Sequence, residues 1–224
     1  MFSNCTSLTQ APELPVTTLA GYCYYNMFQG CTALTQAPAL PATTLATGCY
    51  HSMFKGCTAL TQAPTLPATT LANNCYNSMF RGCTALTQAP ALPAITLVIG
   101  CYRFMFSGCI SLTKSPALPA TTLASGCYEA MFEGCTALIQ VPELPATTLG
   151  KRCYLSMFDS CTSLKLSTTQ TGEYTQEYRI PSSGTGTTES GSLTGMFTST
   201  GGTFTGNPSI NTTYYLSNTN TIVS

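Results

Sequence analysis

Apolar residues recur with a fixed period along the first 164 residues of the chain. One unit, from Cys31 to Gly56, reads CTALTQAPALPATTLATGCYHSMFKG, and its second half places Leu45, Cys49 and Met53 four residues apart. The pattern returns every 26 residues, and each unit opens with a cysteine: Cys5, Cys31, Cys57, Cys83, Cys109, Cys135 and Cys161. A period of roughly 20 to 50 residues is typical of a solenoid, in which each unit buries its apolar face against its neighbours.

Each unit divides into two halves that predict different elements. The segment Leu34–Leu40 contains threonine and is bounded by prolines, which favours a short extended strand. The apolar spacing of four that starts at Leu45 is that of an amphipathic helix, and Thr43 and Thr44 precede it as N-cap candidates. Gly56 ends the predicted helix, since glycine readily takes the left-handed conformation that closes one.

Stacking such units predicts an α/β repeat fold with a curved shape. Stacked strands lie about 4.8 Å apart, whereas neighbouring helices need about 10 Å. A stack with strands on one side and helices on the other must therefore curve. We expect a leucine-rich-repeat type of solenoid, with short parallel strands on its concave side and helices on its convex side.

The repeated motif resembles that of a known family. The run Met-Phe-x-Gly-Cys-Thr-x-Leu-Thr, followed by Leu-Pro and by Cys-Tyr-x-x-Met-Phe, is similar to the BspA-like (Treponema-type) leucine-rich repeats of bacterial surface proteins. The resemblance covers Met1 to about Leu164. It implies a horseshoe or arc, secretion or surface display, and adhesion to host or microbial partners, and it brings no catalytic residues.

The composition changes in the last quarter of the chain. Residues 165–224 contain no cysteine, are rich in Thr, Ser and Gly, and hold two extended-looking pieces, Glu173–Ile180 and Thr212–Leu216. We expect a solenoid domain at 1–164 and a β-rich C-terminal cap at 165–224. The stretch Pro181–Gly191 has too few apolar residues to pack, so we expect a mobile loop there. A linker to a further domain is the alternative interpretation.

Charge and hydropathy exclude two classes of partner. Only 7% of the residues are charged, and the eight Lys and Arg are spread over the whole length. Binding to nucleic acid needs clustered cations, so we expect no nucleic-acid partner. No apolar run approaches the roughly 20 residues that a membrane-spanning helix needs, so we expect no membrane span.

Candidate chemistry is sparse. The chain has one histidine, His51, no glycine-rich phosphate loop, and no close carboxylate pair apart from Glu129 and Glu133, which the helical phase places on the solvent side. The cysteines alternate with spacings of 18 and 8 residues and form no Cys-x-x-Cys motif, which argues against a zinc site. We therefore predict that the protein is not an enzyme and binds no metal or cofactor.

The thirteen cysteines allow two interpretations. Matching cysteines in neighbouring units would lie about one strand spacing apart, within reach of a disulfide bond. All of them, however, lie on the predicted apolar face, where free cysteine packs as a small hydrophobic side chain. Buried, reduced thiols are the favoured interpretation, and disulfide bonds are the alternative.

A polar row on the concave side is the candidate ligand-binding surface. A Thr-Gln pair recurs in the strand half of most units, and Lys114 replaces its glutamine in the fifth. Side chains alternate along a strand, so we expect one member of each pair to face outward and to hydrogen-bond an extended ligand. The alternative is that the repetition reflects duplication and stacking alone. The residues concerned are Thr35, Gln36, Thr61, Gln62, Thr87, Gln88 and Lys114.

Two further surfaces are predicted to be apolar. Ile99 and Phe104 stand where other units carry small or polar residues, so we expect a small apolar patch on the convex side. The first unit starts without a preceding cap and would leave its leucines, Leu8, Leu14 and Leu19, half covered. We expect either an N-terminally incomplete protein or self-association through this end.

These features together predict a non-enzymatic binding or adhesion module that recognises protein or glycan, displayed outside the cell or at its surface. The alternative is a structural or receptor-binding component of a larger assembly, such as a phage appendage or a cell-surface layer. A regular threonine array also permits ice binding, although the predicted curvature would spoil the match to a flat lattice.

Overall fold

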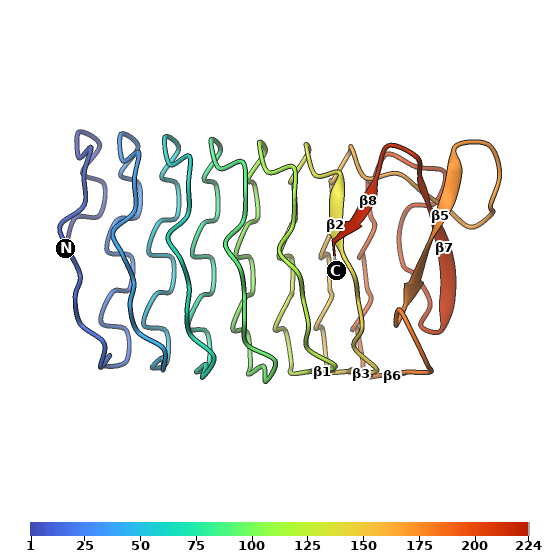
Figure 1. Cartoon of the computed structure of the whole chain (residues 1–224), viewed down its shortest axis with the longest axis horizontal. Coiled ribbons are helices and arrows are strands. Elements are labelled where there is room, and N and C mark those ends of the chain that lie inside the picture. Colours follow the sequence, from blue (N-terminus) through green and yellow to red (C-terminus); the bar gives the residue numbers. More distant parts are fainter. Residues whose placement is uncertain (224) are drawn as a thin grey trace.

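The computed structural model describes residues 1–223 and consists of turns, loops and short strands (Figure 1). Within these residues there is no α-helix. The eight strands are β1 (Thr122–Leu123), β2 (Gln140–Pro142), β3 (Thr148–Leu149), β4 (Leu166–Ser167), β5 (Tyr174–Ile180), β6 (Thr187–Thr188), β7 (Thr212–Ser217) and β8 (Thr221–Val223). The predicted α/β architecture is therefore wrong, because its helical half does not form.

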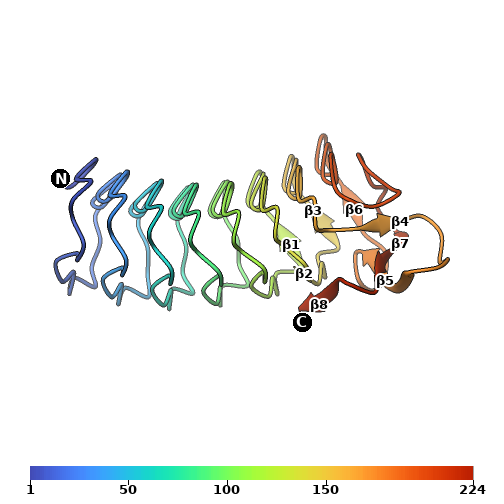
Figure 2. The same ribbon diagram turned by 90° about the horizontal axis from the view of Figure 1, so that it is seen from above.

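The 26-residue units form coils that stack side by side in a row, which is straight in Figure 1 and gently bowed in Figure 2. We number them from their opening cysteines, so that coil 1 is 5–30, coil 2 is 31–56, coil 3 is 57–82, coil 4 is 83–108, coil 5 is 109–134 and coil 6 is 135–160. Single parallel bridges join equivalent residues of neighbouring coils, for example Gln10 to Gln36 and Gln36 to Gln62. Without convex helices, nothing forces the stack into a leucine-rich-repeat horseshoe, and that prediction is also wrong.

The segment predicted as a helix is a series of tight turns. In coil 2, Gly48, Ser52 and Gly56 have φ angles of 57°, 53° and 73°. A right-handed α-helix needs negative φ throughout, so a positive value at every fourth residue prevents it. Gly56 has the left-handed conformation expected of it, but it closes the last of these turns rather than a helix.

The backbone hydrogen bonds of this segment alternate between two directions. One set closes turns within the coil: the N–H of His51 donates to the carbonyl of Gly48 at 3.1 Å. The intervening N–H groups reach the next coil, as Tyr50 N–H does to the carbonyl of Cys75 at 3.0 Å. Each N–H from Gly48 to Gly56 thus has an acceptor, and five of these nine acceptors belong to the neighbouring coil. A coil of this kind is stable only in the stack.

The strand half of each unit is also more broken than a regular strand. Prolines flank its central residues and donate no hydrogen bond, so neighbouring coils pair through single bridges on this side. Longer pairing appears only towards the C-terminal end, where β1, β3 and β6 form a parallel sheet and β2 pairs with β8.

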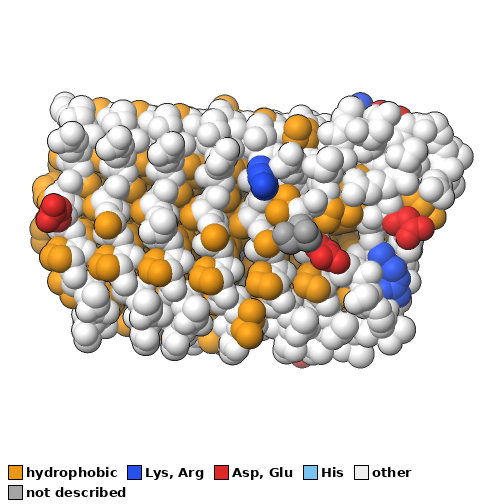
Figure 3. Space-filling view, viewed as in Figure 1, with side chains coloured by type: hydrophobic (Ala, Val, Ile, Leu, Met, Phe, Trp, Pro, Cys, Tyr) orange, Lys and Arg blue, Asp and Glu red, His pale blue; other side chains and the backbone are white. Residues whose placement is uncertain are grey.

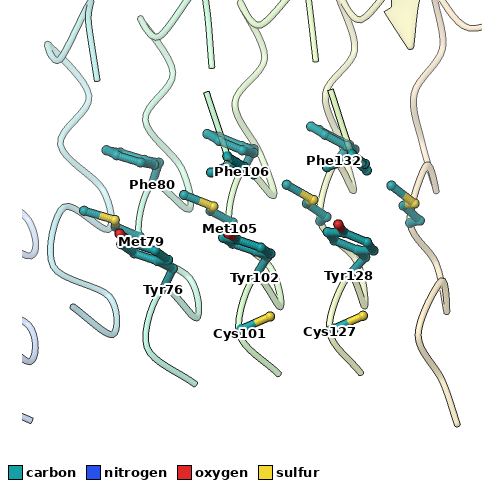
Figure 4. Close-up of a cluster of buried hydrophobic side chains, with 14 of the residues drawn as sticks. Tyr76, Met79, Phe80, Cys101, Tyr102, Met105, Phe106, Cys127, Tyr128 and Phe132 are labelled. Carbon is teal, nitrogen blue, oxygen red and sulfur yellow. The ribbon is translucent and has the colours of Figure 1, made fainter. Parts of the chain in front are cut away.

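Aromatic rings form two ladders through the core. Phe80 and Phe106 stack with ring centroids 5.7 Å apart and planes within 6°, and Tyr76 and Tyr102 stack at 5.8 Å. Figure 4 shows these rings aligned from coil to coil, with the methionines packed between the two ladders. Because each coil supplies the same side chain at the same place, each interior ring is covered on both faces.

The thiols form further ladders beside the rings. All thirteen cysteines are free, and eleven are buried; only Cys5 and Cys23, both in coil 1, are exposed. The opening thiols are ordered by weak hydrogen bonds, as when Cys83 Sγ donates to the carbonyl of Phe54 at 3.1 Å. The buried cysteines therefore pack as small apolar groups, and each buried opening cysteine also donates its S–H to the carbonyl of the phenylalanine 29 residues earlier.

Three separated pieces of the C-terminal segment together build a seventh coil. Strand β6 pairs in parallel with β3, Phe197 stacks on Phe158 at 5.7 Å, and β8 pairs in parallel with β2. The Met-Phe pair at residue 196 lies 39 residues after its predecessor, so the period is lost in sequence but the coil position is kept in space.

The expectation of a mobile loop at Pro181–Gly191 is wrong for part of that stretch. Thr187 and Thr188 form β6, and Ser182 N–H donates to the carbonyl of Leu144 at 2.9 Å. The segment lacks apolar side chains, but the exposed backbone edge of coil 6 supplies hydrogen-bond partners instead.

A small antiparallel sheet covers the end of the stack beyond the seventh coil. Its strand order is β4-β7-β5, and its inner residues Leu166, Ile180 and Leu216 are fully buried. The hydroxyl of Tyr178 donates to the carbonyl of Pro142 at 2.9 Å and ties this sheet to coil 6. Residues 165–223 thus finish the stack with main-chain pairing and extend its hydrophobic core.

Candidate functional site

The Thr-Gln pairs form an exposed row along one edge of the stack. Both members of each pair are exposed, at Thr35 and Gln36 as at the equivalent positions Thr61, Gln62, Thr87 and Gln88. The prediction that only one member would face outward is wrong. These pairs are joined to neighbouring coils by isolated bridges at the glutamine rather than through a continuous strand, so the alternation of faces is not imposed there.

Parallel bridges set the spacing of this row. They join Gln88 to Lys114 and Lys114 to Gln140, and stacked strands of this kind lie about 4.8 Å apart. Between coils 3 and 4 the row opens into a shallow groove of about 280 Å³, lined by Thr61, Gln62, Ala63, Thr87, Gln88, Ala89 and Pro90. Lys114, one coil further along, is exposed and adds the only cation of the row. The row therefore offers amide and hydroxyl groups at coil spacing, with one positive charge.

An apolar strip borders the polar row. Between coils 3 and 4 a second groove is lined mainly by proline and alanine, including Pro64, Pro67, Pro90 and Pro93. Figure 3 shows rows of hydrophobic side chains running along this side of the stack, with rows of uncharged polar atoms beside them and few charged groups. A ligand lying on the polar row would also touch this strip.

A second threonine row was not anticipated as a surface. Thr43, Thr44, Thr69 and Thr70 were interpreted as helix caps or their equivalents, but they are exposed and stand at another corner of the coil. A parallel bridge joins Thr44 to Thr70, and the row continues through β1, β3 and β6. The recurrence of this threonine pair every 26 residues could have predicted an exposed row. It did not, because the pair was assigned to the start of a helix.

The residues predicted for the apolar patch lie on the turn side of coil 4. Ile99 is 54% exposed and Phe104 is half-buried. The guanidinium carbons of Arg81 and Arg103 lie 5.2 and 4.9 Å from the Phe104 ring centroid, which is cation–π distance. There is no convex surface, so the patch belongs to a flat side of the stack.

Glu129 is not the solvated residue that the helical phase predicted. Its side chain is 4% exposed and accepts hydrogen bonds from Arg103 at 2.6 Å and Arg152 at 3.1 Å. These arginines come from coils 4 and 6, on either side of Glu129 in coil 5, positions that the helical phase within one unit does not predict. Glu133 is half-buried and accepts a hydrogen bond from Ser107 at 3.1 Å.

Coil 1 presents an apolar end to solvent. Leu8, Leu14 and Leu19 are half-buried, and Tyr22 and Tyr25 are 56% and 48% exposed. In every interior coil the equivalent leucines are packed between two neighbours. Coil 1 thus carries the same apolar residues as an interior coil, but they are partly exposed to solvent.

Burial controls the protonation of the thiols and phenols in the stack. Desolvation raises the pKa of Cys49 and Cys57 to about 12, and it also raises the pKa of Tyr50 and Tyr76. The thiolate is the reactive form of cysteine, so these buried thiols are poor nucleophiles at neutral pH. Their role is packing rather than chemistry.

A metal site and a membrane-spanning helix are both absent from the part of the chain that the structure describes. Residues 1–223 contain no group of three His, Cys, Asp or Glu side chains placed to hold a metal ion. They also contain no helix long and apolar enough to cross a membrane.

Comparisons of the chain with models of protein families, with curated proteins and with solved structures gave no match. The similarity to BspA-like repeats therefore consists of the sequence motif alone, and the fold lacks the convex helices of a leucine-rich repeat.

Proposed function

We propose that this chain is a non-enzymatic binding module that holds an extended polar ligand, a protein segment or a glycan, along the Thr-Gln row. The observation that carries the proposal is the exposure of both side chains of each pair in successive coils, at a spacing that the stacking fixes. Each coil offers a similar small set of hydrogen-bonding groups. Affinity then grows with the number of coils that the ligand engages.

The surroundings of the row favour an extended ligand over a compact one. The grooves are shallow, and they lie between coils rather than inside a cavity. A ligand running along the stack can place polar groups on the amides and apolar groups on the proline strip. Display at a cell surface suits this role, and the burial of eleven thiols protects them in an oxidising environment.

Glycan-array and protein-panel binding by the purified chain tests the proposal. The triple variant Gln36→Arg, Gln62→Arg, Gln88→Arg should lose about a hundredfold in affinity for the bound probe, because three hydrogen-bonding sites worth about 1 kcal/mol each are replaced by bulky charges. The matched control is Thr44→Arg, Thr70→Arg, Thr122→Arg, which adds the same charge on the other threonine row. Unchanged binding by the glutamine variant would contradict the proposal.

A second candidate function, ice binding, is favoured by one observation. The stack is only gently bowed, so the strong curvature that counted against a flat lattice match is absent, and the threonines of the row at Thr44 and Thr70 are exposed. The same two variants separate the candidates. Ice-recrystallisation inhibition that is lost in the threonine variant and kept in the glutamine variant would support ice binding and overturn the ligand-binding proposal.

A further inference from the structure

The charged residues of the turn side follow an ordered pattern along the stack. We call this side the turn face; it is formed by segments 20–30, 46–56, 72–82, 98–108, 124–134 and 150–160. One position of the unit, just before its last residue, carries Gln29, Lys55, Arg81, Ser107, Glu133 and Asp159 from coil 1 to coil 6. At this position coils 2 and 3 thus carry cations, coil 4 carries a neutral serine, and coils 5 and 6 carry anions.

This pattern is antisymmetric about coil 4. The phenylalanine rings of coils 2, 3 and 4 are spaced by 5.7 and 5.7 Å, and those of coils 4, 5 and 6 by 5.8 and 5.6 Å. The stack runs in a row that bows only gently (Figure 2). Arg81 and Glu133 therefore lie equally far from coil 4 on opposite sides, and so do Lys55 and Asp159.

The four charges are available to an external partner. Among residues 1–223, none of Lys55, Arg81, Glu133 and Asp159 takes part in an intramolecular ion pair. Arg81 is exposed, and the other three are partly exposed. At this position of the unit, the two cations and the two anions therefore have no ionic partner among the described residues. Two further cations lie at the other end of the coil 6 segment, Arg152, which pairs with Glu129, and the exposed Lys151.

The centre of the pattern is apolar. Ile99, 54% exposed, and the half-buried Phe104 both belong to coil 4, where the charges change sign. Arg103, the remaining charged residue of this coil, is already paired with the buried Glu129 at 2.6 Å. An apolar centre with a charged rim is the usual anatomy of a protein–protein interface.

We propose that the turn face is the interface of a homodimer in which two copies pack with their stacks antiparallel. The two-fold axis lies between the faces, perpendicular to the stacks, at coil 4. It brings coil 3 of one copy against coil 5 of the other and coil 2 against coil 6. Arg81 then faces Glu133 of the second copy, Lys55 faces its Asp159, and Ile99 packs on its own equivalent.

A second copy of the chain fits the turn face because its charges are antisymmetric about coil 4. A two-fold interface repeats each contact, so the two kinds of pair occur twice and give four ion pairs around one apolar contact. A parallel arrangement would place Arg81 against Arg81 and is disfavoured by like-charge repulsion. The Thr-Gln row is not on the turn face, so both copies keep it exposed in the dimer.

Sedimentation equilibrium of the full chain at low and high salt tests the dimer. We expect twice the chain mass at low ionic strength and dissociation as salt screens the rim pairs. The variant Lys55→Glu, Arg81→Glu and the variant Glu133→Arg, Asp159→Lys should each weaken self-association by about a hundredfold or more, because attraction becomes repulsion at four places. An equimolar mixture of the two variants should restore the dimer mass, since every pair is again complementary.

The mixture distinguishes an interface effect from misfolding, because a misfolded variant would not regain a partner. The control Lys114→Glu, Arg179→Glu changes the same number of cations off the turn face and should leave the dimer intact. A wild-type chain that stays monomeric at low salt would overturn the proposal. So would variants that remain dimeric alone, or a mixture that stays monomeric.

Discussion

Raising the pH above about 9 should unfold the protein steeply. The ordinary thiol pKa is 9.0, and burial raises the pKa of Cys49, Cys57 and Cys109 to about 12. Below the unfolded-state pKa both states keep these protons, so stability is unaffected there. Between 9 and about 12 the unfolded chain loses protons that the folded chain retains, so the free energy of unfolding falls as pH rises.

The number of buried thiols makes this effect large. Each titrating thiol lowers the free energy of unfolding by about 1.4 kcal/mol for every pH unit above its unfolded pKa. Eleven cysteines are buried, whereas a typical domain is stable by only about 5–15 kcal/mol. The melting temperature should therefore collapse within about one to two pH units above 9.

Thermal melts recorded in steps across this pH range measure the collapse. The variant Cys5→Ser is the control, because this thiol is exposed and its removal should leave the profile unchanged. A melting temperature that stays level between about pH 8 and 10.5 would show that the thiols are not buried as free groups.

Replacing one interior ring of the phenylalanine ladder should cost about 3–5 kcal/mol of stability. Phe106 is fully buried and stacks on Phe80 at 5.7 Å and on Phe132 at 5.8 Å. Phe106→Ala removes both stacking contacts and leaves a cavity that the rigid coils on either side cannot close. Urea denaturation of the variant measures the loss.

The end of the same ladder provides a matched control. Phe2 is half-buried and stacks on one side only, against Phe28 at 5.6 Å. The same substitution there, Phe2→Ala, should cost about a third as much or less, since less apolar surface leaves water in the native state. Equal losses at the two positions would contradict the ladder as a continuous core.

The sequence predicted much of the burial pattern correctly, but it did not predict that the second half of each unit forms turns instead of a helix. The spacing of four among Leu45, Cys49 and Met53 correctly marked an inward-facing row. An α-helix with 3.6 residues per turn and a series of four-residue turns give the same row over so short a segment. The segment is too short to distinguish a helix from repeated turns. In a longer segment, apolar residues spaced by four would gradually rotate around a helix of 3.6 residues per turn.

A distinguishing signal was present at the positions between the apolar ones. Gly48, Ser52 and Gly56 in coil 2 correspond to Asn74, Ser78 and Gly82 in coil 3, and all six have positive φ. Gly, Asn and Ser are turn formers, and the first two tolerate the left-handed conformation best. Turn-forming residues at every fourth position therefore favour repeated turns over a helix.

Contacts between coils could not be predicted from one unit. The burial of Glu129 depends on Arg103, 26 residues earlier, and on Arg152, 23 residues later. The seventh coil depends on three segments that share no sequence period with the others. The burial of Glu129 and the position of the seventh coil both depend on how the coils stack. The stacking in turn depends on the repeated turns, which were predicted to be a helix.

The backbone N–H groups of the turn face donate alternately within their own coil and to the next coil. Through-hydrogen-bond nitrogen–carbonyl couplings in NMR spectra of the isotope-labelled protein test it directly. The account predicts a coupling from the Tyr76 amide to the carbonyl of Cys101 in the next coil, and one from the Met79 amide to the carbonyl of Tyr76. Couplings from each amide to the carbonyl four residues earlier, as from Tyr76 to Ala72, would show an α-helix and contradict it.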